Sequence, residues 1–298
     1  MQRRTFIRET GLFAIGISVF GSVRGNSDLF AGKPTTTTDI LGPYYRPGAP
    51  RRTNINPKGY SENLFHVSGT VRKEDGKTPF ENCLVEIWQC DENRQYDNTS
   101  EQYKYRGSQY TDHNGKYHFI GMHPIPYPVE GDPNIWRPAH IHLLFSGAGQ
   151  QDLVTQIYLE GDPYLEKDKA SAAPEALNRR MKIMTNDKNE EAVRFDVVMA
   201  KQFIPTDHVF STVSGVYKMN DHSVMEFYRK SDLLMMKWNG QIREGLSYQG
   251  SNTFAGGIGH QTIAKFELFK NNEVRVSVHL KTINKGEFDL GGTKTFAY

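Results

Sequence analysis

The chain has 298 residues, with 36 Lys and Arg against 34 Asp and Glu, for a formal net charge of +2. Its first 25 residues hold four arginines and one glutamate, so the rest carries 32 basic and 33 acidic residues and a net charge of −1. This near-neutral remainder argues against nucleic acid as a partner. Roughly 270 residues can also bury an adequate core without disulfides.

The first predicted element is a signal peptide over residues 1–25. Arg3-Arg4-Thr5-Phe6-Ile7-Arg8 resembles a twin-arginine export motif, and an apolar run follows at residues 11–20. Ten residues are too few to span a bilayer and suit a signal peptide. The rival interpretation, an amphipathic first helix, fits poorly because the run is apolar on all sides. We therefore predict an exported protein, periplasmic or extracellular, with no membrane span in the mature chain.

The next predicted element is an extended arm over residues 26–60, rich in Thr, Pro, Gly and Arg. From residue 64 to residue 204 the pattern is one of short strands and turns, which is typical of an antiparallel β-sandwich. Residues 164–190 are expected to hold one short helix. Strands are predicted at residues 65–71, 83–89, 116–120, 139–145, 155–159 and 192–198. The sandwich and its arm are assigned to residues 26–205.

After Pro205 the pattern changes. Turn signals at Asn239-Gly240 and Gly256-Gly257 separate new apolar runs, which predict a second, small antiparallel β domain over residues 206–298. Strands are predicted there at residues 223–229, 233–238, 262–269 and 274–280. The sequence leaves the role of this domain open among a lid, a dimerisation surface and a sugar- or lignin-binding module.

The two cysteines, Cys83 and Cys90, are seven residues apart on or just beyond one apolar strand. In an extended strand they would lie about 23 Å apart and face opposite sides. A disulfide needs Cα atoms within about 7 Å. We therefore expect both thiols to be unpaired.

The most informative motif is His140-Ile141-His142. Two histidines at positions i and i+2 of a strand point to the same face with Cα atoms about 7 Å apart, which suits two imidazoles converging on one metal ion. Arg137 and Pro138 precede the pair, and Tyr127 lies upstream between two prolines that restrict its backbone. A lone His-x-His is weak evidence, and these neighbours strengthen it.

Together with further motifs, this segment resembles the intradiol ring-cleavage dioxygenase family, which includes catechol 1,2-dioxygenase and protocatechuate 3,4-dioxygenase. The matching motifs occur in the family's order from about residue 40 to residue 165, somewhat less than half of the chain. They are Gly42-Pro43-Tyr44-Tyr45, Glu86-Ile87-Trp88-Gln89 leading to Tyr96, Thr111-Asp112 with Gly115-Lys116-Tyr117, Tyr127, Arg137 to His142, and Thr155-Gln156-Ile157-Tyr158 leading to Gly161-Asp162-Pro163.

The resemblance implies a site for Fe(III) whose ligands fall on Tyr96, Tyr127, His140 and His142. Two phenolates and two imidazoles form a hard, anionic ligand set that suits Fe(III) better than zinc or copper(I). In the family, Tyr96 would correspond to the axial ligand, which the incoming catechol displaces and which takes a substrate proton. The reaction would open the ring between the two hydroxyl-bearing carbons with O2 and give a muconate-type diacid.

Two further residues acquire roles from the resemblance. Arg137 corresponds to the arginine thought to stabilise charge developing on the substrate ring, and Gln156 to a glutamine that supports this arginine. Alternatively, Arg137 could merely form an ion pair with a carboxylate on the protein surface. The substrate would be a small aromatic diol, with O2 as co-substrate. The family's catechol-cleaving branch has a helical N-terminal dimerisation domain for which this sequence has no room, and whether the protein forms a homo-oligomer stays open.

Several alternatives remain at this point. Gln95 stands where the family usually has glycine, and Tyr103, Tyr105 and Tyr110 follow Tyr96 closely, so the fourth ligand could be another tyrosine. The chain could also be a non-catalytic β-sandwich binding module. A zinc hydrolase built on the histidine pair is a further rival, which would need a third histidine or a carboxylate ligand. The remaining histidines show no ligand spacing.

Overall fold

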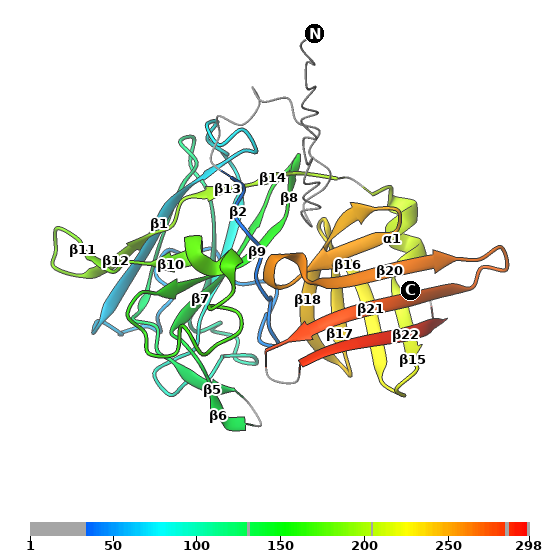
Figure 1. The fold of residues 1–298 in the computed structure, drawn as a ribbon. Helices are drawn as coiled ribbons and strands as arrows, with labels where there is room; N and C mark the ends of the chain where they lie inside the picture. The colour runs from blue at the N-terminus through cyan, green and yellow to red at the C-terminus, as the bar shows by residue number, and fades with distance from the viewer. Residues whose placement is uncertain (1–33, 130–131, 204, 284–285, 297–298) are drawn as a thin grey trace, which may run out of the picture. The chain divides into compact units, whose positions relative to one another are not determined.

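The computed structural model describes residues 34–129, 132–203, 205–283 and 286–296, so the predicted signal peptide lies outside the described residues. In this part of the chain nearly all regular structure is β (Figure 1). The fold class predicted from the sequence is therefore confirmed: a β-sandwich is followed by a small antiparallel β domain. No helix among the described residues is long and apolar enough to cross a membrane.

The first sheet of the sandwich has β1 at its centre. Buried and part-buried residues alternate along β1 because successive side chains of a strand point to opposite faces. β4 pairs with β1 antiparallel, whereas β12 and β13 pair with it in parallel, so the sandwich is mostly but not wholly antiparallel. The strands of this sheet are β1 (Leu64–Arg72), β4 (Lys116–Met122), β11 (Met184–Thr185), β12 (Glu191–Arg194) and β13 (Val197–Val198).

The second sheet carries the strands that matter most for function. Its order is β10-β9-β7-β2-β3, and the central strand β7 and its neighbour β9 are buried along almost their whole length. Such strands have a covered surface on each face of the sheet. The members are β2 (Leu84–Trp88), β3 (Arg106–Tyr110), β7 (His140–Ser146), β9 (Leu153–Leu159) and β10 (Arg180–Met181).

Alternation along β7 divides its side chains between two environments. Ile141, Leu143 and Phe145 belong to the apolar core between the two sheets. His140, His142 and Leu144 therefore point to the opposite, outer face of the second sheet. The same rule brings residues of neighbouring strands beside them on this outer face, because Trp88 and Gln156 are both in register with His142.

Short elements complete the sandwich. The expected short helix in residues 164–190 is a 3-10 helix at Pro174–Arg179, and β10 and β11 occupy the same segment. β3 and the ribbon of β5 and β6 were not foreseen. The remaining strands form two pairs: β5 (Tyr127–Val129) with β6 (Asp132–Arg137), and β8 (Gln150–Gln151) with β14 (Ala200–Lys201).

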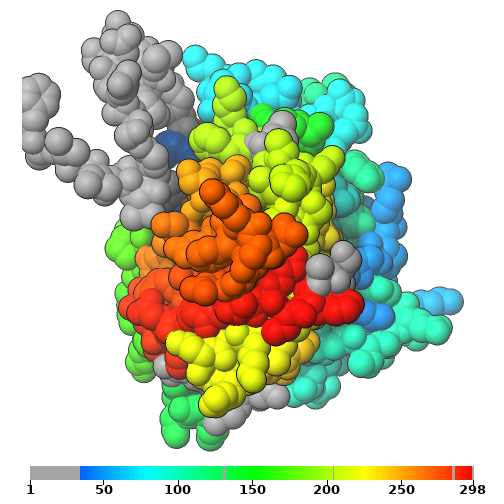
Figure 2. Space-filling model, turned by 90° about the vertical axis from the view of Figure 1, so that its right-hand side faces the viewer, coloured from blue at the N-terminus to red at the C-terminus, as the bar shows by residue number. Residues whose placement is uncertain are grey.

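The C-terminal β domain is a closed barrel of consecutive antiparallel strands, in which β22 returns to pair with β15. An unpredicted helix, α1 (Asp207–Val213), precedes it and contributes Phe210 and Val213 to the barrel's own apolar interior. Figure 2 shows the face of the barrel formed by its last strands, in orange and red. The strands are β15 (Gly215–Met219), β16 (Val224–Lys230), β17 (Leu233–Trp238), β18 (Gln241–Gly250), β19 (Thr253–Gly256), β20 (Thr262–Leu268), β21 (Val274–Thr282) and β22 (Gly286–Phe296); a short 3-10 helix, Ile258–His260, lies between β19 and β20.

The outer face of the second sheet is covered by the arm and by the barrel. A third apolar cluster contains Leu144 and Val154 of the sandwich together with Leu233 and Met235 of β17. The sandwich and the barrel thus have separate interiors but share a buried apolar contact. The assignment of independent domains to residues 26–205 and 206–298 stays a prediction.

Polar contacts reinforce this junction. Lys230 of the barrel lies 2.8 Å from the buried carboxylate of Glu86 on β2, and Tyr45 of the arm donates to the same carboxylate at 3.1 Å. The backbone N–H of Leu41 donates to Glu244 of β18, and the Thr38 hydroxyl donates to the carbonyl of Gly257. The arm is therefore hydrogen-bonded to the barrel as well as to the sandwich.

The two cysteines, Cys83 and Cys90, are both buried and free, as expected.

Candidate metal centre

The four predicted ligands, Tyr96, Tyr127, His140 and His142, come together on the outer face of the second sheet. His140 Nε2 lies 3.1 Å from the phenol oxygen of Tyr127 and 3.4 Å from that of Tyr96, and the two phenol oxygens are 3.3 Å apart. The ring centroids of His140 and His142 are 5.0 Å apart. Two oxygen donors and two imidazoles thus converge from three separate segments of the chain.

The orientation of His140 is set by its own turn. Its Nδ1 donates to the carbonyl oxygen of Pro138 at 2.6 Å, which leaves the Nε2 lone pair facing the phenols. The turn is held in place by Asp162, whose carboxylate accepts a hydrogen bond from the Ala139 N–H at 2.9 Å. A backbone carbonyl that fixes the tautomer in this way is the usual companion of a metal-binding histidine.

His142 is positioned by ring stacking. It lies parallel to the indole of Trp88, with centroids 4.9 Å apart and planes at 10°. No role was assigned to Trp88 from the sequence, although register across β2 and β7 places it beside His142. The Nδ1 of His142 is buried without a hydrogen-bond partner among the described residues. A buried orphan nitrogen of this kind fits a site that binds something further.

The structure distinguishes among the candidate tyrosines. Tyr96 points into the cluster, whereas Tyr103 donates to the Pro47 carbonyl, Tyr105 donates to Glu92, and Tyr110 is exposed. Tyr44 of the arm stacks on Tyr96 with centroids 4.5 Å apart and planes at 13°. The Gly42-Pro43-Tyr44-Tyr45 motif carried no assigned role, and the structure gives Tyr44 a place against the predicted axial ligand.

Burial controls the protonation of this cluster. Burial raises the pKa of Tyr127 to about 12 and, with the neighbouring Tyr127 phenol, raises that of Tyr96 well above its usual value. Burial, and then the charge of Arg137, lowers the pKa of His140 well below its usual value, so its imidazole is neutral. Burial, and then His140, does the same for His142. Neutral imidazoles are ready to ligate, and the phenols would ionise near neutrality only beside a strong cation.

Arg137, at the end of β6, is the charged group of the site. Its Nε lies 2.9 Å from the carboxylate of Asp168, and its Nη2 donates to Gln156 Oε1 at 2.9 Å and to the Tyr158 hydroxyl at 3.3 Å. Burial is the largest single influence and lowers the pKa of the guanidinium, but Asp168, Tyr158 and other acidic neighbours together outweigh burial and raise that pKa above its usual value. Gln156 thus touches Arg137, and its amide nitrogen in turn donates to the Ile40 carbonyl of the arm.

A second buried arginine was not predicted. Arg179, in the 3-10 helix, forms an ion pair with the fully buried Asp39 of the arm. Asp39 also accepts a hydrogen bond from the Tyr158 hydroxyl at 2.8 Å. The arm, β9 and the 3-10 helix are therefore joined behind Arg137 by one network of buried charges and hydrogen bonds. The sequence offered one indication of this network, which is the single acidic residue Asp39 in a stretch of the arm rich in Thr, Pro and Gly.

The donor set fits Fe(III). Phenolate oxygens are hard anionic ligands, and neutral imidazole nitrogens complete a mixed set typical of non-haem iron rather than of structural zinc. Among the described residues, no group of three or more His, Cys, Asp or Glu is placed to hold a metal ion. The alternative of a zinc hydrolase requires a third histidine or a carboxylate as ligand. The groups that lie beside the histidine pair in this structure are instead two phenols.

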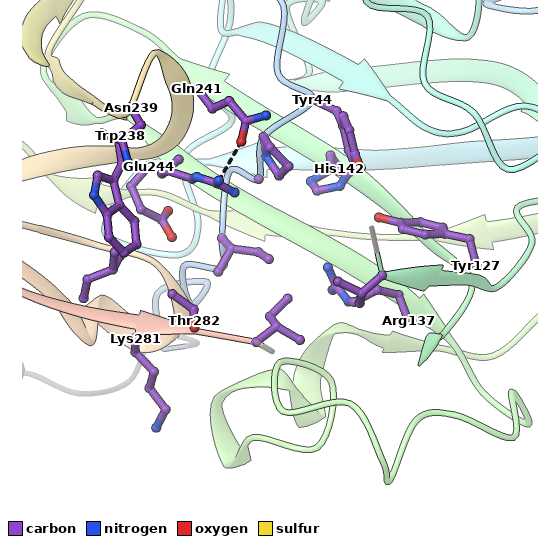
Figure 3. A pocket seen from close by; sticks show the side chains of 17 residues that line it. Tyr44, Tyr127, Arg137, His142, Trp238, Asn239, Gln241, Glu244, Lys281 and Thr282 are labelled. Carbon is purple, nitrogen blue, oxygen red and sulfur yellow. Dashed lines mark hydrogen bonds between the residues drawn. The ribbon is translucent and has the colours of Figure 1, made fainter. Parts of the chain in front are cut away.

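A cavity of about 370 Å³ opens from this cluster, within the range of roughly 300–1,000 Å³ common for small-molecule sites. Tyr44, Tyr127, Arg137 and His142 line it on the side of the sandwich (Figure 3). Its other wall belongs to the barrel.

Four of the other histidines have partners outside this cluster: His66 pairs with Glu190, His118 stacks on His66, His123 pairs with Glu191, and His279 pairs with Asp289.

Comparison with known proteins places this chain in a defined class. Residues 40–201 match a family model described as "Dioxygenase". The chain is 29% identical over 198 residues to chlorocatechol 1,2-dioxygenase of Rhodococcus opacus (59% of this chain, 77% of the relative). It is 32% identical over 193 residues to catechol 1,2-dioxygenase 2 of Acinetobacter lwoffii (57% of this chain, 69% of the relative).

Among solved structures, a catechol 1,2-dioxygenase from Acinetobacter sp. ADP1 is similar with a TM-score of 0.50 and 25% identity. That match covers 57% of this chain and 64% of the solved one, so it spans less than two thirds of that protein. The class is that of the dioxygenases, which are oxidoreductases. The chain belongs to the intradiol dioxygenase family, and the matched region ends at residue 201, before the barrel begins.

Proposed function

We propose that this protein is a non-haem Fe(III) dioxygenase that cleaves the ring of a catechol-type aromatic between its two hydroxyl-bearing carbons. O2 contributes both of its atoms, and the product is a muconate-type diacid, so the reaction balances without an external reductant. Family membership supports the reaction class. The observation that carries the iron assignment is the convergence of Tyr96, Tyr127, His140 and His142 beside Arg137.

When bound, Fe(III) would supply Lewis acidity and redox activation of the aromatic diol toward O2. Tyr96, Tyr127, His140 and His142 would hold it as ligands. Tyr96 would act as the proton acceptor for one substrate hydroxyl, because burial makes its phenolate a strong base. Its ring is kept in place meanwhile by the stacked ring of Tyr44.

Arg137 would stabilise negative charge that develops on the opening ring. Its guanidinium is permanently charged, and contacts with Asp168, Gln156 and Tyr158 fix its position before substrate arrives. A charge that is already oriented needs little reorganisation during reaction, which is the main source of electrostatic catalysis. Gln156 acts as a positioning residue, since it touches Arg137 and holds the arm through Ile40.

Colour, iron content and product together test this function. Tyrosinate-to-iron(III) charge transfer should make the purified protein red-brown, and oxygen uptake with catechols should yield a ring-opened diacid. Tyr127→Phe should lose the colour and most bound iron, because it removes one ligand from a site with no spare. Tyr110→Phe, at an exposed tyrosine outside the cluster, is the matched control. A colourless wild type loaded with iron, or a Tyr127→Phe variant with full colour and turnover, would contradict the proposal.

We further propose that the protein is exported to the periplasm or beyond by a twin-arginine route. The support is the Arg3-Arg4 motif with its short apolar run, which lies outside the described residues. That route carries folded proteins, so the iron site could form before export.

A further inference from the structure

The barrel forms one wall of the cavity that opens from the metal centre. Trp238, Gln241, Arg243, Glu244, Lys281 and Thr282 line it there. Figure 3 shows Tyr44, Tyr127 and His142 at one end and Trp238, Gln241 and Glu244 at the other, with the cavity between them. A catechol held through its two hydroxyls at the metal end would therefore direct a ring substituent toward the barrel.

Two residues of the barrel wall carry buried hydrogen-bond donors that have no acceptor among the described residues. Arg243 Nε and Trp238 Nε1 are both buried without a hydrogen-bond partner among the described residues. Another nitrogen of Arg243, Nη2, donates to Gln241 Oε1 at 2.6 Å, and this hydrogen bond restrains the guanidinium. Buried polar groups in proteins are nearly always satisfied, so two orphan donors on one cavity wall indicate an acceptor-rich ligand.

The other cationic side chains that line the cavity each lie beside an acidic partner. Arg137 is neutralised by Asp168 at 2.9 Å, and Lys281 lies 3.4 Å from Glu287. Arg243 forms no ion pair among the described residues, and its adjacent carboxyl, Glu244, is almost completely buried. The charge that the wall leaves uncompensated is therefore the positive charge of Arg243.

Resting on the function proposed above, we propose that the barrel selects the substrate: it binds a carboxylate on a side chain of the catechol ring, with Arg243 as its charged partner. A carboxylate offers only acceptors, and it matches the two lone donors of Arg243 and Trp238. Glu244 is compatible with this anion, because burial raises its pKa to about 8 and keeps it protonated near neutral pH. In that form it repels no anion and can donate a hydrogen bond.

The test compares acids with their size-matched neutral amides. The probes are 3,4-dihydroxybenzoate, 3,4-dihydroxyphenylacetate and 3-(3,4-dihydroxyphenyl)propionate, each with its primary amide, so that tether length varies by one carbon at a time. For at least one pair, wild type should prefer the acid in kcat/KM by roughly ten- to hundredfold, the range for a hydrogen bond to a charged group. Arg243→Gln should bring this ratio close to one.

Arg275→Gln is the matched control, because Arg275 is an exposed barrel arginine paired with Glu273, away from the cavity. It should keep the wild-type ratio. Using a ratio removes any general loss of activity that a variant causes. The inference is overturned if catechols are cleaved without an acid preference, or if Arg243→Gln retains that preference; the dioxygenase function stands in either case.

Binding measured by calorimetry without oxygen separates the two proposals further. The acid should bind wild type and Arg275→Gln more tightly than the amide does, and Arg243→Gln should bind both alike. If no catechol were cleaved, the proposed function would fail, and this binding pattern would still decide whether the barrel recognises the carboxylate. Equal binding of acid and amide by wild type would overturn the inference by itself.

Discussion

Replacing Glu244 by glutamine should make the stability of this protein less sensitive to pH. Glu244 is 3% exposed, and its Oε2 accepts a hydrogen bond from the Leu41 N–H at 3.2 Å. Burial, and then the nearby Asp39, raises its pKa from 4.5 to about 8, while Leu41 and Arg243 act in the opposite direction. The folded protein therefore holds a proton here that the unfolded chain releases near pH 4.5.

Proton linkage gives the direction in which pH changes the free energy of unfolding. Because the folded state binds the extra proton, the contribution of Glu244 to the free energy of unfolding is complete below pH 4.5 and is lost as pH rises toward 8. The loss is about 1.4 kcal/mol per pH unit within that window. Between pH 5 and pH 8 wild type should thus lose about 4 kcal/mol that a Glu244→Gln variant retains. Glutamine also keeps an acceptor for the Leu41 N–H.

Urea unfolding of both proteins at half-unit steps from pH 5 to pH 9 measures this difference. Near pH 5 the two should be similar, and at pH 8 to 9 the variant should be the more stable. Glu267→Gln, at an exposed position of β20, should follow wild type throughout. Other titrating carboxyls act equally in wild type and variant, so they cancel in the comparison. A stability difference that is the same at pH 5 and at pH 9 would refute the reasoning.

Three further outcomes are expected. Tyr96→Phe should reduce turnover far more than iron content, measured by activity and metal analysis, whereas the same phenotype in Tyr103→Phe would contradict the ligand assignment. Leu233→Ala should lower the free energy of unfolding by about 2–5 kcal/mol in urea titrations, because it opens a cavity in the cluster that joins barrel and sandwich; an unchanged midpoint would show that this contact adds no stability. Changing Arg3 and Arg4 together to lysine should leave iron-loaded protein in the cytoplasm on fractionation, and normal export would exclude the twin-arginine route.

Local pattern was enough to predict the centre of the site. The spacing of His140 and His142 on a strand places both imidazoles on one face, and the structure shows β7 with that alternation. The expected strands of the sandwich and four strands of the barrel also appear within a few residues of their predicted bounds. These features depend on periodicity along a single segment, which a sequence displays directly.

Contacts between distant segments could not be predicted in the same way. The stacking of Tyr44 on Tyr96 depends on where the arm crosses the sheet, and no local pattern encodes that position. The parallel pairing of β12 and β13 with β1 and the closure of β22 onto β15 are likewise long-range. The barrel wall of the cavity was missed for this reason, since Arg243 lies about one hundred residues beyond the predicted ligands.

The arm meets the barrel through residues from nearly opposite ends of the described chain. The hydrogen bond from Thr38 to Gly257 joins positions 219 apart, and that from Leu41 to Glu244 joins positions 203 apart. Because synthesis proceeds from the N-terminus, these bonds cannot form until the barrel strands have left the ribosome. The arm also carries Tyr44 and Asp39, which support Tyr96 and the network behind Arg137. The hydrogen bonds that hold the arm against the barrel therefore form only after the barrel strands have been synthesised, and a chain terminated before the barrel would lack one wall of the cavity.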